Sequence, residues 1–208
     1  MLPHAAFALV RHGQTEWNLH KRIQGSTDIP LNATGRAEAV STGLSLLTRS
    51  ELPARRWDLI VASPLLRAAE TARIIADELG LTAPVALDAL TERHHGAIEG
   101  LSFAERQQRF PDGVAVPGLE PRQSVLDRVL PALAHLAAQH PGRRILVVTH
   151  GGVIGTVIRH LTDDQRPSHN ELIRNGSVHD FTWHDGRLRL EHFDSSPREP
   201  GEPGHTRG

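Results

Sequence analysis

The chain has 208 residues, 38% of them hydrophobic, a formal net charge of -1 and no cysteine. This length fits one substantial core, so we expect a single catalytic domain as the default. The missing cysteines exclude disulfides, thiolate catalysis and cysteine metal sites, and the near-neutral charge gives no reason to expect nucleic acid or an anionic membrane as a partner.

The start of the chain has no signal-peptide pattern, and no apolar stretch is long enough to span a membrane, so a cytoplasmic location is expected. The 14 histidines raise the question of a metal site. Neither an HExxH motif nor a paired-cysteine motif accompanies them. We therefore expect neither a metal nor a cofactor.

Apolar runs alternate with helical segments along the chain, which predicts an α/β layered domain. The runs typical of buried strands are FALV, DLIVAS, VAL and RILVVTH, at 7–10, 58–63, 85–87 and 144–150. The strongest helix covers 64–80, with Ser63 as its cap, Pro64 in its first turn and Gly80 at its end. Residues 124–139 also have helical spacing, although Pro131 should kink or divide that helix.

Three later segments complete the prediction. Residues 100–123 lose periodicity and are expected to form a loop or lid-like insertion over the site. Residues 181–193 alternate around Asp185 and Gly186, which predicts a hairpin of antiparallel edge strands on a mostly parallel sheet; such an edge could support a homodimer. We expect one domain over 1–193 and a disordered tail over 194–208.

Chemistry-bearing side chains follow each predicted strand. In an open α/β sheet ligands bind beyond the carboxyl ends of the strands, where Arg11, His12, Arg67, Glu92 and His150 fall. Each alone has an ordinary structural explanation, but five such explanations at once are improbable. Gly after His in both His-Gly pairs lets the backbone leave strand geometry.

Two arginines, two histidines and one carboxylate suit a dianionic phosphoryl group. Arginine matches phosphate oxygens bidentately, and its charge stabilises the transferring group. One histidine could attack phosphorus through a neutral ring nitrogen and form a phosphohistidine. Glu92 could then protonate the leaving oxygen and later activate water.

The motifs LVRHGQTEWN, SPLLRAAETA, LTERHHGAIEGLS and VVTHGGVI, in this order over roughly residues 7–190, resemble the histidine phosphatase superfamily, also called phosphoglycerate mutase-like. The resemblance implies a three-layer α/β/α sandwich with a mixed, mostly parallel sheet and no metal requirement. It also implies that His12 is the phosphorylated nucleophile, that Glu92 is the proton donor, and that Arg11, Arg67 and His150 form the phosphate pocket. Family members line the same pocket at the positions of Thr15, Asn18, Gln24, Gly25 and Gly151, and His95 is a further candidate substrate contact.

Phosphatases and mutases share these motifs. The family's mutases hold the substrate carboxylate and second phosphate with a lysine and a paired arginine on an inserted segment. Here Phe103 stands at the lysine position, Arg106 and Arg109 are separated, and His95 replaces the mutase aromatic. Fewer cations retain a doubly charged intermediate less well, so hydrolysis is favoured, unless Arg106, Arg109 or Arg122 folds into the pocket.

We therefore predict a phosphatase-type member of the phosphoglycerate mutase branch, a histidine acid-type phosphomonoesterase acting on small phosphorylated metabolites. A 2,3-bisphosphoglycerate-dependent phosphoglycerate mutase is the alternative. A phosphate-binding pseudoenzyme ranks last, because all five strand-end residues are present. The physiological substrate stays open, since selectivity depends on the variable segment 101–123.

Overall fold

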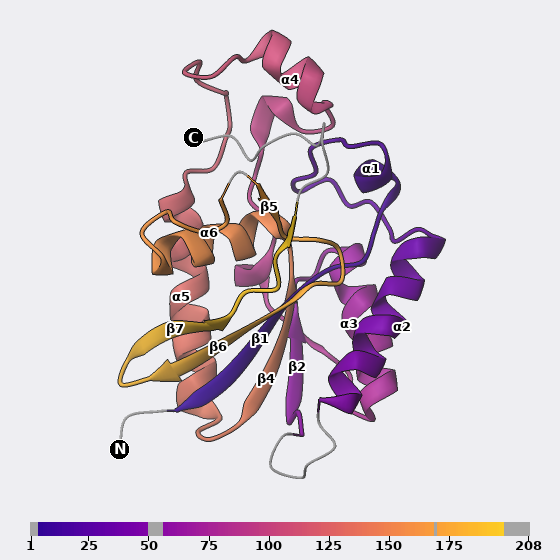
Figure 1. Ribbon diagram of the computed structural model, residues 1–208, viewed down its shortest axis with the longest axis vertical. Helices are drawn as coiled ribbons and strands as arrows, with labels where there is room; N and C mark the ends of the chain where they lie inside the picture. The colour runs from indigo at the N-terminus through magenta and orange to yellow at the C-terminus, as the bar shows by residue number, and fades with distance from the viewer. Residues whose placement is uncertain (1–3, 50–55, 169, 198–208) are drawn as a thin grey trace.

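The computed structural model describes residues 4–49, 56–168 and 170–197 (Figure 1). Its main sheet has the strand order β3-β2-β4-β1-β6-β7. Four strands run parallel, namely β1 (Ala5–Arg11), β2 (Leu59–Ala62), β3 (Val85–Ala86) and β4 (Arg144–Thr149). Two run antiparallel to their neighbours, β6 (Val178–His184) and β7 (Arg187–His192). This is the mixed, mostly parallel sheet that the sequence predicts.

Helices cover both faces of this sheet (Figure 1). On one face lie α2 (Ala33–Thr48) and α3 (Leu66–Leu79), and on the other α5 (Arg122–Gln139) and α6 (Gly151–Leu161). Strand β1 contributes to the core on both faces of the sheet because its side chains point alternately to the two faces. Phe7 and Leu9 pack in the core with α5 and α6, whereas Ala8 and Val10 pack in the core with α3. The predicted three-layer α/β/α sandwich is confirmed. None of the described helices has the length and apolar character needed to cross a membrane.

The short elements are α1 (Glu16–Leu19), η2 (Asp88–Leu90), η3 (Gly96–Ile98), α4 (Phe103–Arg109), and the strands β5 (Glu171–Leu172) and β8 (Ser196–Pro197), which pair antiparallel. Figure 1 shows α1, α4 and β5 beyond the end of the sheet toward which β1 runs. They therefore surround the carboxyl ends of the parallel strands, where the sequence places the site.

The start of α3 differs from the prediction. The helix begins at Leu66 with Leu65 as its N-cap residue, and the Ser63 hydroxyl accepts a bond from the Leu65 amide without capping the helix. The hydroxyl of Ser63 instead contacts His150. At the other end Gly80 is the predicted C-cap, with a left-handed φ of 64° that glycine adopts without strain.

Two segments are more helical than the sequence indicates. Helix α5 continues across Pro131, although we expected a kink or a division there. The segment 100–123, expected to be a loop or lid, contains α4, whose N-terminus has a capping box in which Ser102 and Glu105 exchange bonds. The capping signal S-x-x-E is present in the sequence but precedes too short a helix to show periodicity.

The end of the chain contains the predicted hairpin, formed by β6 and β7 around Asp185 (φ 52°) and Gly186 (φ 74°). The predicted disorder from residue 194 is wrong for residues 194–197. The Asp194 carboxylate accepts a bond from the Val178 amide, and Ser196–Pro197 pairs with β5. The remaining part of that prediction, 198–208, lies outside the described residues.

Candidate active site

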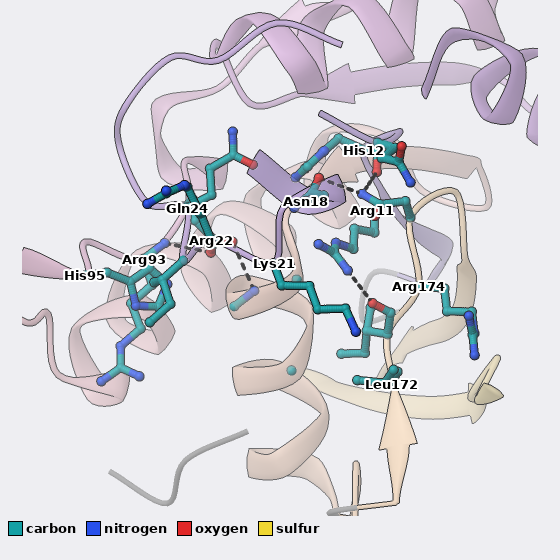
Figure 2. Close-up of a pocket in the computed structure, with 18 of the residues that line it drawn as sticks. Arg11, His12, Asn18, Lys21, Arg22, Gln24, Arg93, His95, Leu172 and Arg174 are labelled. Atoms are coloured by element: carbon teal, nitrogen blue, oxygen red, sulfur yellow. Dashed lines mark hydrogen bonds between the residues drawn. The ribbon is translucent and has the colours of Figure 1, made fainter. Parts of the chain in front are cut away.

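A pocket of about 530 Å³ lies at the carboxyl ends of the parallel strands, and Figure 2 shows the side chains around it. Arg11 comes from the end of β1, His12 follows it directly, Glu92 follows η2, and Gly151 begins α6. Among the other predicted site residues, Asn18, Gln24 and His95 line the same pocket. Of the five strand-end residues, Arg11, His12 and Glu92 line this cavity, whereas Arg67 and His150 do not line it and lie close to His12.

His12 is held as a neutral ring with one free nitrogen. Its Nδ1 lies 2.7 Å from the Gly13 carbonyl, and because a carbonyl only accepts, Nδ1 carries the proton. This leaves the lone pair on Nε2. The side chain is buried, and burial lowers the pKa of His12 well below its ordinary value of 6.5, helped by the positive charges of Arg11 and Arg67.

A close approach of two backbone segments requires glycine at position 13. A Cβ at Gly13 would lie 2.2 Å from the Gly35 carbonyl oxygen, and a Cβ at Gly35 would lie 2.1 Å from the Gln14 carbonyl oxygen. The loop after β1 therefore packs directly on the first turn of α2. The Gly13 amide also donates to the Thr71 hydroxyl on α3, which fixes the backbone beside His12.

His150 lies behind His12, with ring centroids 5.2 Å apart. It is fully buried at the N-terminus of α6, and its Nε2 shares a hydrogen bond with the Ser63 hydroxyl. Burial and then the neighbouring His12, Arg67 and Arg11 lower the pKa of His150 well below its ordinary value. Two adjacent neutral imidazoles therefore lie together, with His12 on the pocket wall and His150 buried against it.

The arginines are aimed by backbone carbonyls. Arg11 Nη1 donates to the Ile173 carbonyl, and fully buried Arg67 donates to the carbonyls of Thr27 and Gly25. Burial lowers the pKa of both guanidinium groups, and the charge of Glu92 opposes that effect. Both remain cations, as arginine does in proteins.

Several buried polar atoms of this site have no partner. Seven buried side-chain nitrogens lack a hydrogen bond within the described part of the chain, and four of them are Arg11 Nε, Gln24 Nε2, Arg67 Nε and His150 Nδ1. An unsatisfied buried donor is costly, so such groups call for a ligand or another explanation. The clustering of these nitrogens around His12 fits an anion with several acceptor oxygens.

Glu92 is placed by two backbone amides. Its Oε1 accepts from the Arg93 amide at 2.8 Å, and its Oε2 accepts from the Gly152 amide at 3.1 Å. A Cβ at Gly152 would lie 2.5 Å from Glu92 Oε1, so glycine is needed for the carboxylate to sit against the first turn of α6. The carboxylate thus has a fixed position at the wall opposite β1.

Two of the predicted substrate contacts do not line the pocket and instead bond to other residues of the site. Thr15 is fully buried and caps α1, and its hydroxyl bonds to Asn18 and Gln24. Gly25 supplies a carbonyl to Arg67. Neither Thr15 nor Gly25 lines the cavity, whereas Asn18 and Gln24 do. In this structure Thr15 and Gly25 support neighbouring side chains, and their direct contact with phosphate stays a prediction.

Asn175 is a site residue that the strand-end analysis missed. Its amide donates to the His12 carbonyl and to Asn18 Oδ1, and it lines the pocket. It precedes β6, and because β6 runs antiparallel to β1, the start of β6 lies beside the end of β1. The rule for parallel strands does not cover this position.

Only some of the arginines of the segment 100–123 line the pocket. Arg106 turns to Asp112 and Gln107 and does not line the pocket, nor does Arg109. Arg122 does line it, and so does Arg93, which the sequence analysis did not consider. The described residues contain no group of three or more His, Asp or Glu side chains arranged to hold a metal ion.

Comparisons with known proteins agree with this geometry. Residues 7–196 match the model of the histidine phosphatase superfamily, branch 1. The chain is 35% identical to the uncharacterized phosphatase PhoE of Bacillus subtilis over 90% of this chain and 93% of that protein. It is 36% identical to phosphoglycerate mutase-like protein 4 of Arabidopsis thaliana over 88% and 81% of the two chains.

A solved structure is similar as well. The mycobacterial glucosyl-3-phosphoglycerate phosphatase in complex with vanadate superposes with a TM-score of 0.77 and 31% identity, covering 92% of this chain and 99% of that one. The family match covers most of the chain, and its fold and motifs are those described above. The chain therefore belongs to branch 1 of the histidine phosphatase superfamily.

Proposed function

We propose that this protein is a phosphomonoesterase that hydrolyses small phosphorylated metabolites through a phosphohistidine on His12. The observation that carries the proposal is the protonation pattern of His12, whose Nδ1–H is tied to the Gly13 carbonyl. Its Nε2 is therefore a neutral nucleophile close to the cations Arg11 and Arg67, each of which has an unpartnered Nε. A site that keeps a histidine neutral beside cations suits attack on a dianionic phosphoryl group.

In the first step His12 Nε2 attacks phosphorus, and the bond from phosphorus to the leaving oxygen breaks. The arginines, with His150, Asn18 and Gln24, hold the non-bridging oxygens, and Glu92 gives a proton to the leaving oxygen. In the second step water attacks the phosphohistidine, Glu92 takes its proton, and inorganic phosphate is released. His95 and Gly151 line the cavity beside these groups and are proposed to contact the substrate.

Phosphoglycerate mutase activity is the second candidate, favoured by one observation. Arg93 and Arg122 line the pocket, so cations other than Arg106 and Arg109 of α4 are available to retain a second anionic group. A mutase would return the phosphoryl group to a second hydroxyl and would need priming by a bisphosphorylated compound. We place hydrolysis first because Phe103 occupies the wall where the mutases have a lysine.

The test is phosphate release from a panel of phosphomonoesters with a chelator present, run beside conversion of 3-phosphoglycerate with and without 2,3-bisphosphoglycerate. We expect chelator-resistant hydrolysis, no primer-dependent isomerisation, and an acid-labile phosphoryl label on His12 after rapid quenching. Primer-dependent isomerisation that outruns hydrolysis would make the protein a mutase. A protein that binds phosphate but neither hydrolyses nor isomerises any ester would be the pseudoenzyme.

A further inference from the structure

Lys21 is the only lysine in the chain, because 22 of its 23 lysine and arginine residues are arginine. It follows α1 and lines the mouth of the pocket. Figure 2 shows its side chain running across the opening toward β5, where Leu172 is drawn. The sequence analysis gave it no role.

The backbone at Lys21 is in a conformation that lysine disfavours. Its φ is 52°, in the left-handed region, and its amide donates to the Asn18 carbonyl while the Arg22 amide donates to the Trp17 carbonyl. Glycine or asparagine would close this turn with less strain. A long cationic side chain is thus placed at the pocket mouth despite its backbone cost.

Other cations at the mouth are bonded to the protein. Arg22 donates to the Gly100 carbonyl and faces Glu105, and Arg93 donates to the Glu120 carbonyl. The Lys21 ammonium makes no hydrogen bond or ion pair with any residue in 4–49, 56–168 or 170–197. It is also exposed, so it can move to meet a ligand.

The charge around the pocket is strongly one-sided. Two carboxylates line it, against these cations: Arg11, Lys21, Arg22, Arg93, Arg122, Arg159 and Arg174. A single phosphoryl group bound at His12 would engage the inner arginines only. The arginines at the mouth have partners within the protein, so the exposed ammonium of Lys21, unbonded within the described residues, is the cation available for a second negative charge on the ligand.

We propose that Lys21 is a specificity-determining residue that binds a second anionic group, a carboxylate or a phosphate, on the leaving-group side of the substrate. This inference rests on the proposed function, since a phosphoryl group on His12 directs the leaving group past Glu92 to the mouth. An ammonium on a flexible stem suits an anion that is presented at varying positions, whereas the buried forked arginines suit one fixed phosphoryl group.

The test compares esters that differ in one anionic group. One pair is 3-phosphoglycerate and glycerol 3-phosphate; the other is fructose 1,6-bisphosphate and fructose 6-phosphate. We expect Lys21→Met to lower kcat/KM about tenfold, through KM, for the anionic member of one pair, and to change the other member within about twofold. A loss confined to the first pair would show that Lys21 binds a carboxylate, and a loss confined to the second pair would show that it binds a phosphate. Lys21→Arg should restore most of the loss.

Arg73→Met is the matched control, because it removes one positive charge from the exposed face of α3 and does not line the pocket. It should leave both pairs unchanged. Equal losses for all four esters with Lys21→Met, or no loss for any, would overturn the inference, since Lys21 would then act as general positive charge or not at all.

A binding measurement separates this inference from the proposed function. Lys21 is the only side-chain amine, so acetylation by an amine-reactive ester can be followed on one peptide by mass spectrometry. In His12→Ala, which should not turn over its ligand, the ester with the second anionic group should protect Lys21 and its counterpart without that group should not. If the wild type hydrolyses no ester, the proposed function fails while selective protection would still support the anion site; absent protection by both 3-phosphoglycerate and fructose 1,6-bisphosphate would refute it.

Discussion

The inner end of the pocket and its mouth are built on different principles. At the inner end His12, Arg67 and His150 are at most 2% exposed, and carbonyls, glycine contacts and a serine hydroxyl fix them. At the mouth Lys21 and Arg22 are exposed on a short turn, and α4 contributes Phe103. Buried, preoriented groups suit stabilisation of a transition state, whereas mobile surface groups suit discrimination among leaving groups.

The inner end stores a cost of burying charge that the exposed mouth does not. Arg11 and Arg67 are cations with unpaired buried nitrogens, and two histidines are kept neutral beside them. Binding of a phosphoryl dianion would satisfy these groups at once. Changes at the inner end should therefore affect chemistry and pH dependence, and changes at the mouth should affect KM.

The largest effect is expected from His12→Ala. Removing a covalent nucleophile should lower kcat at least about a thousandfold, because the remaining site can only position a water. Stopped reactions should carry no phosphoryl label, and thermal unfolding should show that the variant still folds. A label retained on His150, whose ring lies 5.2 Å away, would mean that the two histidines exchange roles or that His150 is the nucleophile.

A smaller but still large effect is expected from Gly152→Ala. The added Cβ would lie 2.5 Å from Glu92 Oε1 and should displace the proposed proton donor, lowering kcat about a hundredfold. Gly155→Ala is the control on the same helix, because its Cβ would meet only Ile173 Cδ1 at 3.4 Å, an ordinary contact. Similar kcat values for the two variants would mean that the position of Glu92 does not determine the rate of the reaction.

The sequence is most informative where strands end. Arg11, His12, Glu92 and Gly151 line one pocket, as the rule for parallel strands predicts, since each follows or begins an element at the same edge of the sheet. The layers could be predicted for a similar reason: the apolar runs at β1, β2 and β4 are long, and the helix at α3 ends in a clear glycine signal.

The rest depends on contacts between segments that are far apart in the chain. The requirement for Gly13 comes from Gly35, and the placement of Asn18 depends on Asn175, which is 157 residues away. Thr15 looked like a phosphate donor because a hydroxyl near the site can donate, but its oxygen caps α1 and its proton is directed to Asn18 or Gln24. Local patterns carry no information on such pairings until the strands are placed.

The pH dependence should distinguish the inner end from an exposed site. Since burial and neighbouring arginines lower the pKa of His12 well below 6.5, kcat/KM should hold as pH falls from 7 through 6.5 and decline only below that, giving the acid limb of a bell-shaped profile. The alkaline limb should belong to the coupled site as a whole rather than to one residue. An acid limb centred at or above 6.5 would contradict a buried neutral His12.

The free energy of unfolding should depend on pH in the same direction as the acid limb of the activity. The unfolded chain takes up protons on these histidines below about pH 6.5 while the folded chain does not, so the free energy of unfolding should decrease as pH falls below that value. His179, outside the pocket, contributes in the same direction, because burial lowers its pKa to about 4. Urea unfolding at pH 7.5 and 5 measures the difference; equal stabilities would mean that the histidines become protonated without unfolding.

The smallest effect is expected at the mouth from Ser102→Ala. Loss of the capping box should destabilise α4 by about 1 kcal/mol and loosen Phe103 on the pocket wall, raising KM roughly twofold while kcat stays the same. Gln108→Ala, on the exposed face of the same helix, keeps the cap and should leave KM unchanged. Amide exchange of α4 would report the loosening directly. A fall in kcat comparable to that of Gly152→Ala would mean that α4 organises the inner end too, and the division of the pocket into a catalytic end and a selective mouth would not hold.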